Sequence, residues 1–327
     1  MGTAVRFLWS SLWKDSNEPL RKGIHETREV KEMATKRVHF YSEGARLAGI
    51  LYLPDGASGE ERKAGIVLCH GFTGIKEFLL PQYAEAFAQA GFAALTFDYR
   101  GFGESDGQRG RLLWQDQTAD IINAITFLST QSEVNPDRIG LWGTSYGGAL
   151  APYVLAVDDR AKACVGQLGF GDAASAMAAR MPAEVIDSFR PMIEEDRRQR
   201  VLHNNPTYGD AMELAGDPEM TAFMKEYSKK LPHLEGRQIL LQFLEAHLQF
   251  SPMSVIHKKG DRPLLLIAAE LDVVCPMENY KLLYDKAPEP KEWVVFEKTR
   301  HFEFYDGESA LRSAGEAVRF FQEHLGG

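Results

Sequence analysis

The sequence predicts an α/β fold, with a mostly parallel central sheet, helices on both of its faces and a helical cap inserted between two strands. Three observations predict it. Apolar, strand-like runs alternate with helical segments over most of the chain, an order typical of parallel sheets. A Gly-x-Ser-x-Gly sequence, residues 143–147, stands between one such strand and a helix. Residues 169–261, roughly 90 in number, contain no convincing strand, which is too long for a simple loop in a compact domain.

The elements begin with a hairpin. Residues 38–41 and 47–53 alternate polar and apolar side chains around a short turn, the pattern of an antiparallel pair. Further apolar runs predict strands at residues 65–69, 92–97, 138–142, 163–168, 263–268 and 292–296. Helices are predicted at residues 81–90, 118–129, 148–156 and 309–324. These elements define an N-terminal helical extension (1–37), a core (38–168 and 262–327) and the cap (169–261).

Composition indicates one sizeable enzyme-like domain, because 327 residues with 44% hydrophobic content can bury a large core. A net charge of −9 argues against nucleic-acid binding, for which a basic stripe is expected. Cys69, Cys164 and Cys275 lack CxxC spacing, so they predict neither a disulfide framework nor a zinc site, but buried free thiols in a cytoplasmic protein. The chain has no apolar run of about 20 residues, so stable membrane insertion is not expected.

The N-terminal segment combines apolar residues at helical spacing with a charged stretch from Asp15 to Arg37. The apolar residues are Phe7, Leu8, Trp9, Leu12 and Trp13. Neither a signal peptide nor a myristoylation signal is expected, since Arg6 stands where the latter needs Ser or Thr. The segment could pack on its own domain, form a dimer contact, lie on a membrane surface or act as a lid. Its balanced charges favour protein contact, and a homodimer through residues 1–35 is the partner we expect.

The predicted cap is rich in methionine and aromatic side chains. They are Met177, Met181, Met192, Met212, Met220, Phe223, Met224, Tyr227, Phe243 and Phe250. Such residues could line a pliable apolar pocket, although at helical spacing they also suit the cap's own core. Because the cap interrupts the sheet, we expect it to set specificity and to contribute no residue to the chemistry.

The Gly-x-Ser-x-Gly sequence is typical of a nucleophile elbow, a turn so sharp that the serine adopts a strained backbone conformation. Gly143 and Gly147 leave the room that such a turn needs, and Ser145 would stand at the carboxyl end of the strand. A chance match in a glycine-rich loop is the alternative, and the flanking strand and helix argue against it.

A serine nucleophile needs a base and a group that orients the base. Asp272 follows the strand-like run 263–268, and Glu270 is its nearest competitor. His301 follows the run 292–296, and no other of the nine histidines occupies such a loop after a late strand. The chain order Ser145, Asp272, His301 is the order of nucleophile, acid and base that accompanies this elbow.

An acyl-transfer site also needs N–H donors for the developing oxyanion. The backbone N–H of Tyr146, at the start of the helix after the elbow, is one expected donor. The second is the N–H of Phe72, in the loop after residues 65–69, where Gly71 lets the backbone pass close to a substrate. His70 is expected to brace this loop rather than to transfer protons.

These motifs resemble the α/β-hydrolases over residues 65–327. The resemblance rests on the His70-Gly71 loop, the run from Asp98 to Ser105 (DYRGFGES), the elbow, Asp272 and the run HFEFY at 301–305. It is strongest to dienelactone-hydrolase-like and X-Pro-dipeptidyl-peptidase-like serine hydrolases. It implies a Ser-Asp-His triad, no cofactor, no metal and hydrolysis through an acyl-enzyme. Ser stands here where true dienelactone hydrolases have Cys, and no propeller or jelly-roll domain accompanies the core.

The expected activity is hydrolysis of a carboxylic ester, lactone or thioester of a small molecule. Cleavage of a carbon–carbon bond in a diketone-like substrate is an alternative that uses the same triad. A non-catalytic receptor that keeps the ligand pocket is the alternative from another class.

Overall fold

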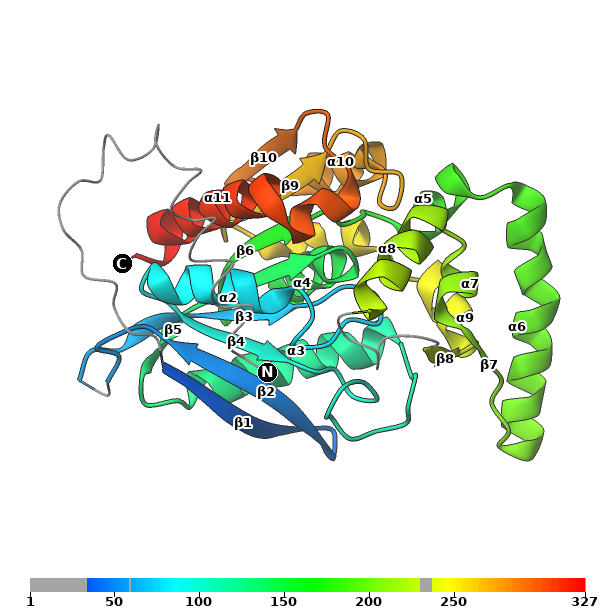
Figure 1. Cartoon of the computed structure of the whole chain (residues 1–327), viewed down its shortest axis with the longest axis horizontal. Coiled ribbons are helices and arrows are strands. Elements are labelled where there is room, and N and C mark those ends of the chain that lie inside the picture. The colour runs from blue at the N-terminus through cyan, green and yellow to red at the C-terminus, as the bar shows by residue number, and fades with distance from the viewer. Residues whose placement is uncertain (1–33, 59, 230–236, 327) are drawn as a thin grey trace. The chain divides into compact units, whose positions relative to one another are not determined.

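The computed structural model describes residues 34–58, 60–229 and 237–326, and its centre is an eight-stranded sheet (Figure 1). The strands are β1 (Ala34–Ser42), β2 (Ala45–Leu53), β3 (Lys63–Cys69), β4 (Ala93–Phe97), β5 (Val134–Thr144), β6 (Ala161–Gln167), β9 (Leu264–Ala269) and β10 (Lys291–Phe296). They lie in the order β1-β2-β4-β3-β5-β6-β9-β10. The β1–β2 and β2–β4 pairs are antiparallel and all other neighbours are parallel, which confirms the predicted fold class.

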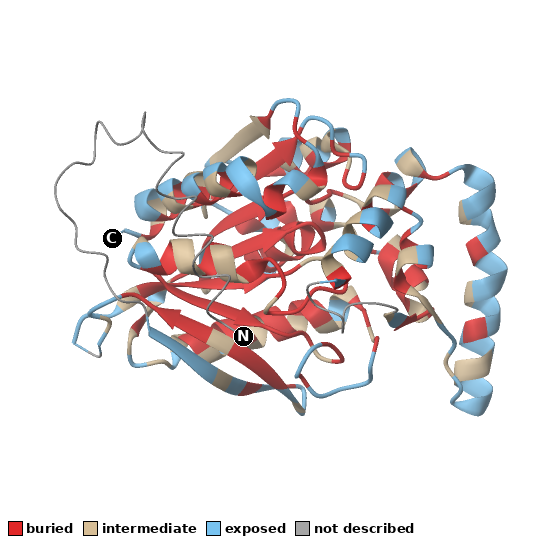
Figure 2. Cartoon of the chain, in the orientation of Figure 1, coloured by how far each residue is buried: buried red, intermediate tan, exposed pale blue. Residues whose placement is uncertain are grey.

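Helices cover both faces of this sheet. Each face of the sheet has its own hydrophobic core, and alternate residues of β3 belong to one or the other. Ile66 and Leu68 pack with α2 (Leu80–Gln89) and α11 (Gly307–Leu325). Val67 and Cys69 pack with α3 (Trp114–Ser129) and α4 (Tyr146–Val157) on the other face. Successive side chains of a strand point to opposite faces, so a strand between two helical layers is apolar throughout. Figure 2 shows the central strands as a continuous buried layer, as their unbroken apolar sequences predict.

The segment between β6 and β9 is mostly helical. It contains α5 (Ala173–Arg180), α6 (Ala183–His203), α7 (Ala211–Ala215), α8 (Pro218–Ser228), α9 (Gln242–Leu248) and the short turns η3 (Pro252–Ser254) and η4 (Ile256–Lys259). It also contains an antiparallel pair, β7 (Tyr208–Asp210) and β8 (Gln238–Leu240), although no strand was expected here. Each of these strands has only three residues, which is too short for the alternation of apolar and polar side chains to be recognised in the sequence.

Helix α6 differs from the other inserted helices because it buries only Phe189 and Asp196 of its 21 residues. Figure 2 shows it as a largely exposed rod at the margin of the inserted segment. Asp196 accepts hydrogen bonds from the side chain of Arg200 and from the backbone N–H of Thr207, and these bonds tie the end of α6 to the loop that follows.

Other elements also differ from the sequence predictions: β5 and α3 each begin four residues earlier than expected, at Val134 and Trp114. Strand β1 begins at Ala34 rather than at residue 38, because Ala34–Arg37 pair with the end of β2 although their side chains are exposed. Exposed polar residues at the sheet edge leave no apolar signal. Helix α10 (Met277–Lys286) follows Pro276 and was not expected. It buries only Asn279, Tyr280 and Leu283, which is too little to stand out in a charged sequence.

The helical extension was predicted for residues 1–37 and the homodimer contact for residues 1–35. Residues 34–37 belong to β1 instead of a helix, and residues 1–33 lie outside the described residues, so for them both stay predictions. Among the described residues, no helix combines the length and the apolar character needed to cross a membrane. Cys69, Cys164 and Cys275 are buried free thiols, as expected.

Candidate active site

Ser145 lies in a strained turn between β5 and α4. Its backbone angles are φ 57° and ψ −121°, a conformation that side-chain-bearing residues rarely adopt. A Cβ atom added to Gly143 would lie 2.0 Å from the carbonyl oxygen of Gly147, and one added to Gly147 would lie 2.1 Å from that of Cys69. Both glycines are therefore needed for the close approach of α4 to the sheet, as the elbow prediction requires.

Asp272 and His301 reach Ser145 from the loops after β9 and β10. Nδ1 of His301 lies 2.7 Å from Oδ2 of Asp272, and Nε2 lies 3.1 Å from Oγ of Ser145. Oδ1 of Asp272 accepts the backbone N–H groups of Val274 (2.9 Å) and Cys275 (2.7 Å). Since both carboxylate oxygens accept hydrogen bonds, Asp272 favours the imidazole form with its proton on Nδ1, which leaves Nε2 free to accept from Ser145.

Glu270, the competing carboxylate, has a different position. Its Oε2 accepts the backbone N–H of Lys298 at 2.6 Å, and its own N–H donates to the carbonyl of Phe296. These bonds brace the loop that carries His301 from outside the site.

The two expected oxyanion donors belong to backbone segments that adjoin Ser145. Tyr146 is the first residue of α4, so its N–H has no intrahelical partner. The loop of Phe72 runs beside the serine, since a Cβ added to Gly71 would lie 3.0 Å from Cβ of Ser145. The donor roles of both residues remain predictions.

His70 braces the loop that carries Phe72. Its Nδ1 lies 3.0 Å from the carbonyl oxygen of Gly71, and its ring packs edge-on against Tyr99 at 4.3 Å between centroids. Burial lowers the pKa of His70 to about 4, so the imidazole is neutral near pH 7. A buried neutral ring suits a bracing role better than proton transfer.

A buried ion pair links this loop to the DYRGFGES run. Asp98 accepts hydrogen bonds from the backbone N–H of Lys76 (2.7 Å) and from its Nζ (2.8 Å), and both side chains are almost fully buried. It also accepts the N–H of Glu104. Gly103 leaves room for the carboxylate, because a Cβ there would lie 2.2 Å from it. Asp98 therefore fixes the loop after β3 to the loop after β4.

Tyr305 contacts His301, and the sequence analysis did not single it out although it belongs to the HFEFY run. It ends the 3-10 turn η5 (His301–Tyr305), and its hydroxyl lies 3.3 Å from Nε2 of His301. The same hydroxyl lies 3.3 Å from Oγ1 of Thr144, which accepts from Nε2 of Gln167 at 3.1 Å. The only signal available was the spacing of four residues from His301.

The far end of this network has fixed donors: Tyr83 donates its hydroxyl proton to the carbonyl of Phe304 at 2.8 Å, and Nε2 of Gln167 donates both to Tyr83 and to Thr144. The hydroxyl of Tyr305 lies 3.3 Å from both Oγ1 of Thr144 and Nε2 of His301. With the imidazole proton on Nδ1, Nε2 can only accept, so its contact with Tyr305 needs the tyrosine hydroxyl as the donor.

Two small cavities, each of about 40 Å³, meet at Ser145. The first is lined mainly by apolar side chains of Phe78, Leu79, Met212, Met220, Phe223, Met224 and Phe302. The second is lined by Phe170, Met177, Arg180, Leu214, Met220, Phe243, His247 and Cys275, among others. Six of the expected pocket residues thus line a cavity: Met177, Met212, Met220, Phe223, Met224 and Phe243. Met181, Met192, Tyr227 and Phe250 line neither.

Cys275 is a second potential nucleophile beside Ser145. Burial raises the pKa of its thiol well above the usual range, and the neighbouring charge of Asp272 acts in the same direction. The thiol is therefore protonated near pH 7, and only a thiolate is strongly nucleophilic.

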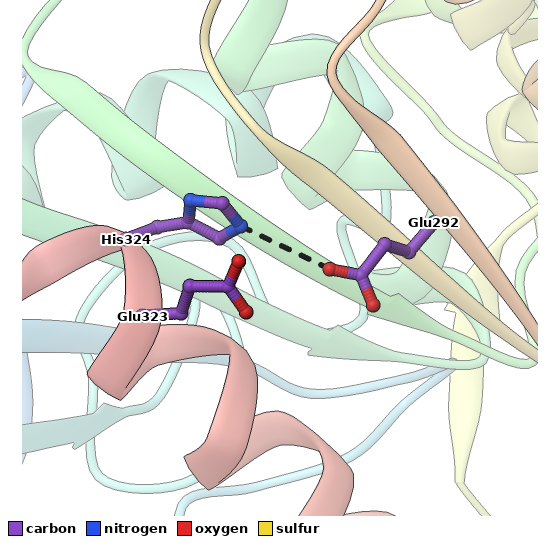
Figure 3. A group of neighbouring side chains, drawn as sticks. All are labelled: Glu292, Glu323 and His324. Atoms are coloured by element: carbon purple, nitrogen blue, oxygen red, sulfur yellow. Dashed lines mark ion pairs between the residues drawn. The ribbon is translucent and has the colours of Figure 1, made fainter.

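One group of side chains has the composition of a metal site: Glu292, Glu323 and His324 (Figure 3). Nε2 of His324 lies 3.9 Å from Oε1 of Glu292, and Arg319 forms ion pairs with both glutamates. The guanidinium of Arg319 already pairs with both carboxylates. The group also lies at the start of β10, whereas His301 follows the end of that strand. It therefore has no part in the chemistry at Ser145.

Comparisons with known proteins show the family and the fold. The family model described as serine aminopeptidase, S33, matches residues 60–308. An uncharacterised 31.7 kDa protein of Escherichia coli, from the traX-finO intergenic region, is 35% identical over 88% of this chain and 98% of its own length. The thiohydrolase aneE of Aspergillus aculeatus is 28% identical over 92% of this chain and 97% of its own.

Two further matches are a relative with a transferase name and a solved structure. The polyketide transferase claH of Penicillium crustosum is 28% identical over 89% of this chain and 98% of its own. The crystal structure of the α/β hydrolase GrgF from Penicillium sp. sh18 superposes with a TM-score of 0.75 at 23% identity, over 89% of this chain and 99% of that one. At this identity the superposition shows a shared fold.

Proposed function

Since this chain belongs to the serine aminopeptidase S33 family of α/β hydrolases, we propose that it is a serine hydrolase acting on a carboxylic ester, lactone or thioester of a small to medium-sized molecule. One observation carries the proposal. The imidazole of His301 lies between a buried carboxylate, 2.7 Å away, and a serine held in a strained elbow, 3.1 Å away.

In the first step Ser145 attacks the acyl carbon while Nε2 of His301 takes its proton. Asp272 holds the imidazole in the tautomer that can accept this proton and offsets the positive charge that results. The leaving alcohol or thiol then takes the proton from His301, and an acyl-enzyme remains on Ser145. Water, activated by the same imidazole, attacks the acyl carbon and releases the acid.

In both steps a negative charge develops on the carbonyl oxygen, and hydrogen bonds from the backbone N–H groups of Phe72 and Tyr146 stabilise it. Their positions beside Ser145 support this role, because donors that are already fixed need no reorganisation as the charge forms. Removal of one such donor in other enzymes costs about 2.7–4 kcal/mol of transition-state stabilisation.

Transfer of the acyl group to an acceptor other than water is a second candidate, favoured by the similarity to the polyketide transferase claH. It uses the same acyl-enzyme and differs only in the second step. Which of the two reactions occurs depends on whether water or another nucleophile reaches the acyl-enzyme through the cavities.

A fluorophosphonate probe and a panel of ester and thioester substrates test the proposal. We expect labelling of Ser145 and turnover of at least part of the panel, with both lost in Ser145→Ala. Release of free acid in water supports hydrolysis, whereas product formation only when an alcohol, thiol or amine is added supports transfer. Intact protein that neither labels nor turns over any ester, thioester or β-diketone would exclude both reactions and favour a non-catalytic receptor.

A further inference from the structure

The second cavity beside Ser145 contains polar groups that the proposed chemistry does not use. It lies between the elbow and the helices α5, α7, α8 and α9. Its wall of inserted helices is apolar except for two basic side chains, Arg180 from α5 and His247 from α9. A purely apolar acyl chain would need neither of them.

His247 is buried, with 5% of its surface exposed, and its ring stacks on Phe243 at 5.1 Å between centroids. Its Nδ1 has no hydrogen-bond partner in the described part of the chain. Burial lowers the pKa of His247 to about 3, with the charge of Arg180 acting in the same direction, so the ring is neutral near pH 7. A neutral, buried imidazole with an unused nitrogen can exchange a hydrogen bond with an uncharged ligand.

Arg180 is held at the same cavity by a long contact with a buried carboxylate. Its Nη1 lies 4.0 Å from Oδ2 of Asp217, whose other oxygen accepts the N–H of Met220 at the start of α8. The Nε–H of Arg180 is buried and has no acceptor among the described residues. Buried donors are nearly always satisfied in folded proteins, so an open donor on a cavity wall points to a ligand oxygen.

The charges around the cavity favour an uncharged ligand over a carboxylate. The guanidinium of Arg180 is balanced by Asp217, and His247 carries no charge. Asp272 and Asp172 add negative charge nearby, through their electrostatic interactions with Cys275 and His247. An anionic group would therefore meet no net positive charge, whereas a hydroxyl or keto oxygen needs only a donor.

We propose that this cavity is the acyl-binding subsite and that it takes a short acyl group with an uncharged hydroxyl or keto oxygen near the reacting carbonyl. That oxygen accepts a hydrogen bond from Nε–H of Arg180 and pairs with Nδ1 of His247. A volume of about 40 Å³ suits a few heavy atoms, since one water needs about 10–15 Å³ on the same scale. The first cavity then receives the alcohol or thiol part. This inference rests on the proposed function, because it assumes an acyl group on Ser145.

The test compares four N-acetylcysteamine thioesters of similar size: butyryl, 3-hydroxybutyryl, 3-oxobutyryl and succinyl. Rates of thiol release give kcat/KM for each. We expect the better of the two uncharged oxygenated substrates to exceed butyryl at least 10-fold, and succinyl to fall below butyryl.

Two variants assign this preference to the cavity. Arg180→Met removes the donor and keeps an apolar stem, and His247→Phe keeps the ring and its stacking without the nitrogens. In each, the oxygenated-to-butyryl ratio should fall below about 3. His247→Gln, which returns a polar side chain, should recover part of the ratio. Arg190→Met and His203→Phe on the exposed helix α6 are matched controls and should leave the ratio and the rates unchanged.

The outcomes separate this inference from the proposed function. If the wild-type protein hydrolyses butyryl thioester with no preference for an oxygenated chain, the subsite is wrong and the hydrolase proposal stands. The same conclusion follows if the preference survives in both Arg180→Met and His247→Phe while Ser145 still reacts with a fluorophosphonate. If no thioester is cleaved and Ser145 does not label, the proposed function itself fails.

Discussion

The hydroxyl of Tyr305 and Nε2 of His301 lie 3.3 Å apart, so the imidazole nitrogen that faces Ser145 has a second donor. With the imidazole proton on Nδ1, Nε2 can only accept, so this contact needs the hydroxyl of Tyr305 as its donor. It also holds the ring in place before a substrate arrives.

Tyr305→Phe should therefore lower kcat/KM without abolishing it, because one contact that orients the imidazole is lost. The lost hydrogen bond is worth about 0.5–1.5 kcal/mol, which corresponds to a fall of roughly 2- to 13-fold. Rates on a reactive thioester measure it, with Tyr41→Phe on the exposed face of β1 as the control. A Tyr305→Phe protein with the kcat/KM of the wild type would show that the hydroxyl does not orient the imidazole.

The triad variants should differ in the activity that they retain. Ser145→Ala and His301→Ala should each lower kcat by about 10⁶-fold, whereas Asp272→Asn should keep a small residual activity. In Asp272→Asn the amide oxygen must accept the N–H groups of Val274 and Cys275, so the NH₂ group faces Nδ1 of His301. The imidazole proton is then forced onto Nε2, which cannot accept from Ser145, and activity should fall about 10⁴-fold.

Glu270→Gln is the matched control, because its amide oxygen can still accept the N–H of Lys298. It should keep activity close to that of the wild-type protein. A crippled Glu270→Gln beside a near-normal Asp272→Asn would mean that the acid of the triad has been assigned to the wrong carboxylate.

The two buried neutral histidines should make stability fall with acid. Burial lowers the pKa of His70 to about 4 and that of His247 to about 3, whereas an unfolded histidine titrates near pH 6.5. Between these pH values the unfolded chain binds more protons than the folded protein does. The contribution of the two histidines to the free energy of unfolding is therefore complete above about pH 6.5 and decreases as the pH falls. At pH 5 each residue should account for a loss on the order of 2 kcal/mol.

Urea denaturation at pH 7 and pH 5 measures this effect. His247→Phe should lose less stability between the two pH values than the wild-type protein does, whatever its stability at pH 7. His203→Phe, at the exposed end of α6, should follow the wild-type protein. An equal loss in His247→Phe and wild type would show that His247 does not titrate with unfolding.

Met224 on α8 should help to select the alcohol or thiol part of the substrate, because it lines the first cavity. Met224→Ala enlarges that cavity, and the ratio of kcat/KM for octyl butyrate to that for ethyl butyrate should rise roughly 5-fold, as about 1 kcal/mol of added apolar contact predicts. Met192→Ala, exposed on α6, is the control. A Met224→Ala protein that no longer reacts with a small fluorophosphonate would place Met224 in the chemistry rather than in selection.

Local patterns in the sequence were enough for the fold and for the order of Ser145, Asp272 and His301 along it. A strand buried on both faces must be apolar throughout, and a sharp turn before a helix must be rich in glycine, so both leave a signal within a few residues. The carboxyl ends of parallel strands meet at one edge, and the loops that carry Ser145, Asp272 and His301 therefore converge there.

Only the tertiary structure decided which other side chains reach this edge. The hydroxyl of Tyr305 contacts His301 because η5 turns back toward Thr144, and Arg180 and His247 share a cavity although 67 residues separate them. Nothing in the neighbouring sequence distinguishes Arg180 and His247 from other polar residues on helices. Their environment is set by how the inserted helices pack over the elbow, which depends on contacts between segments far apart in the chain.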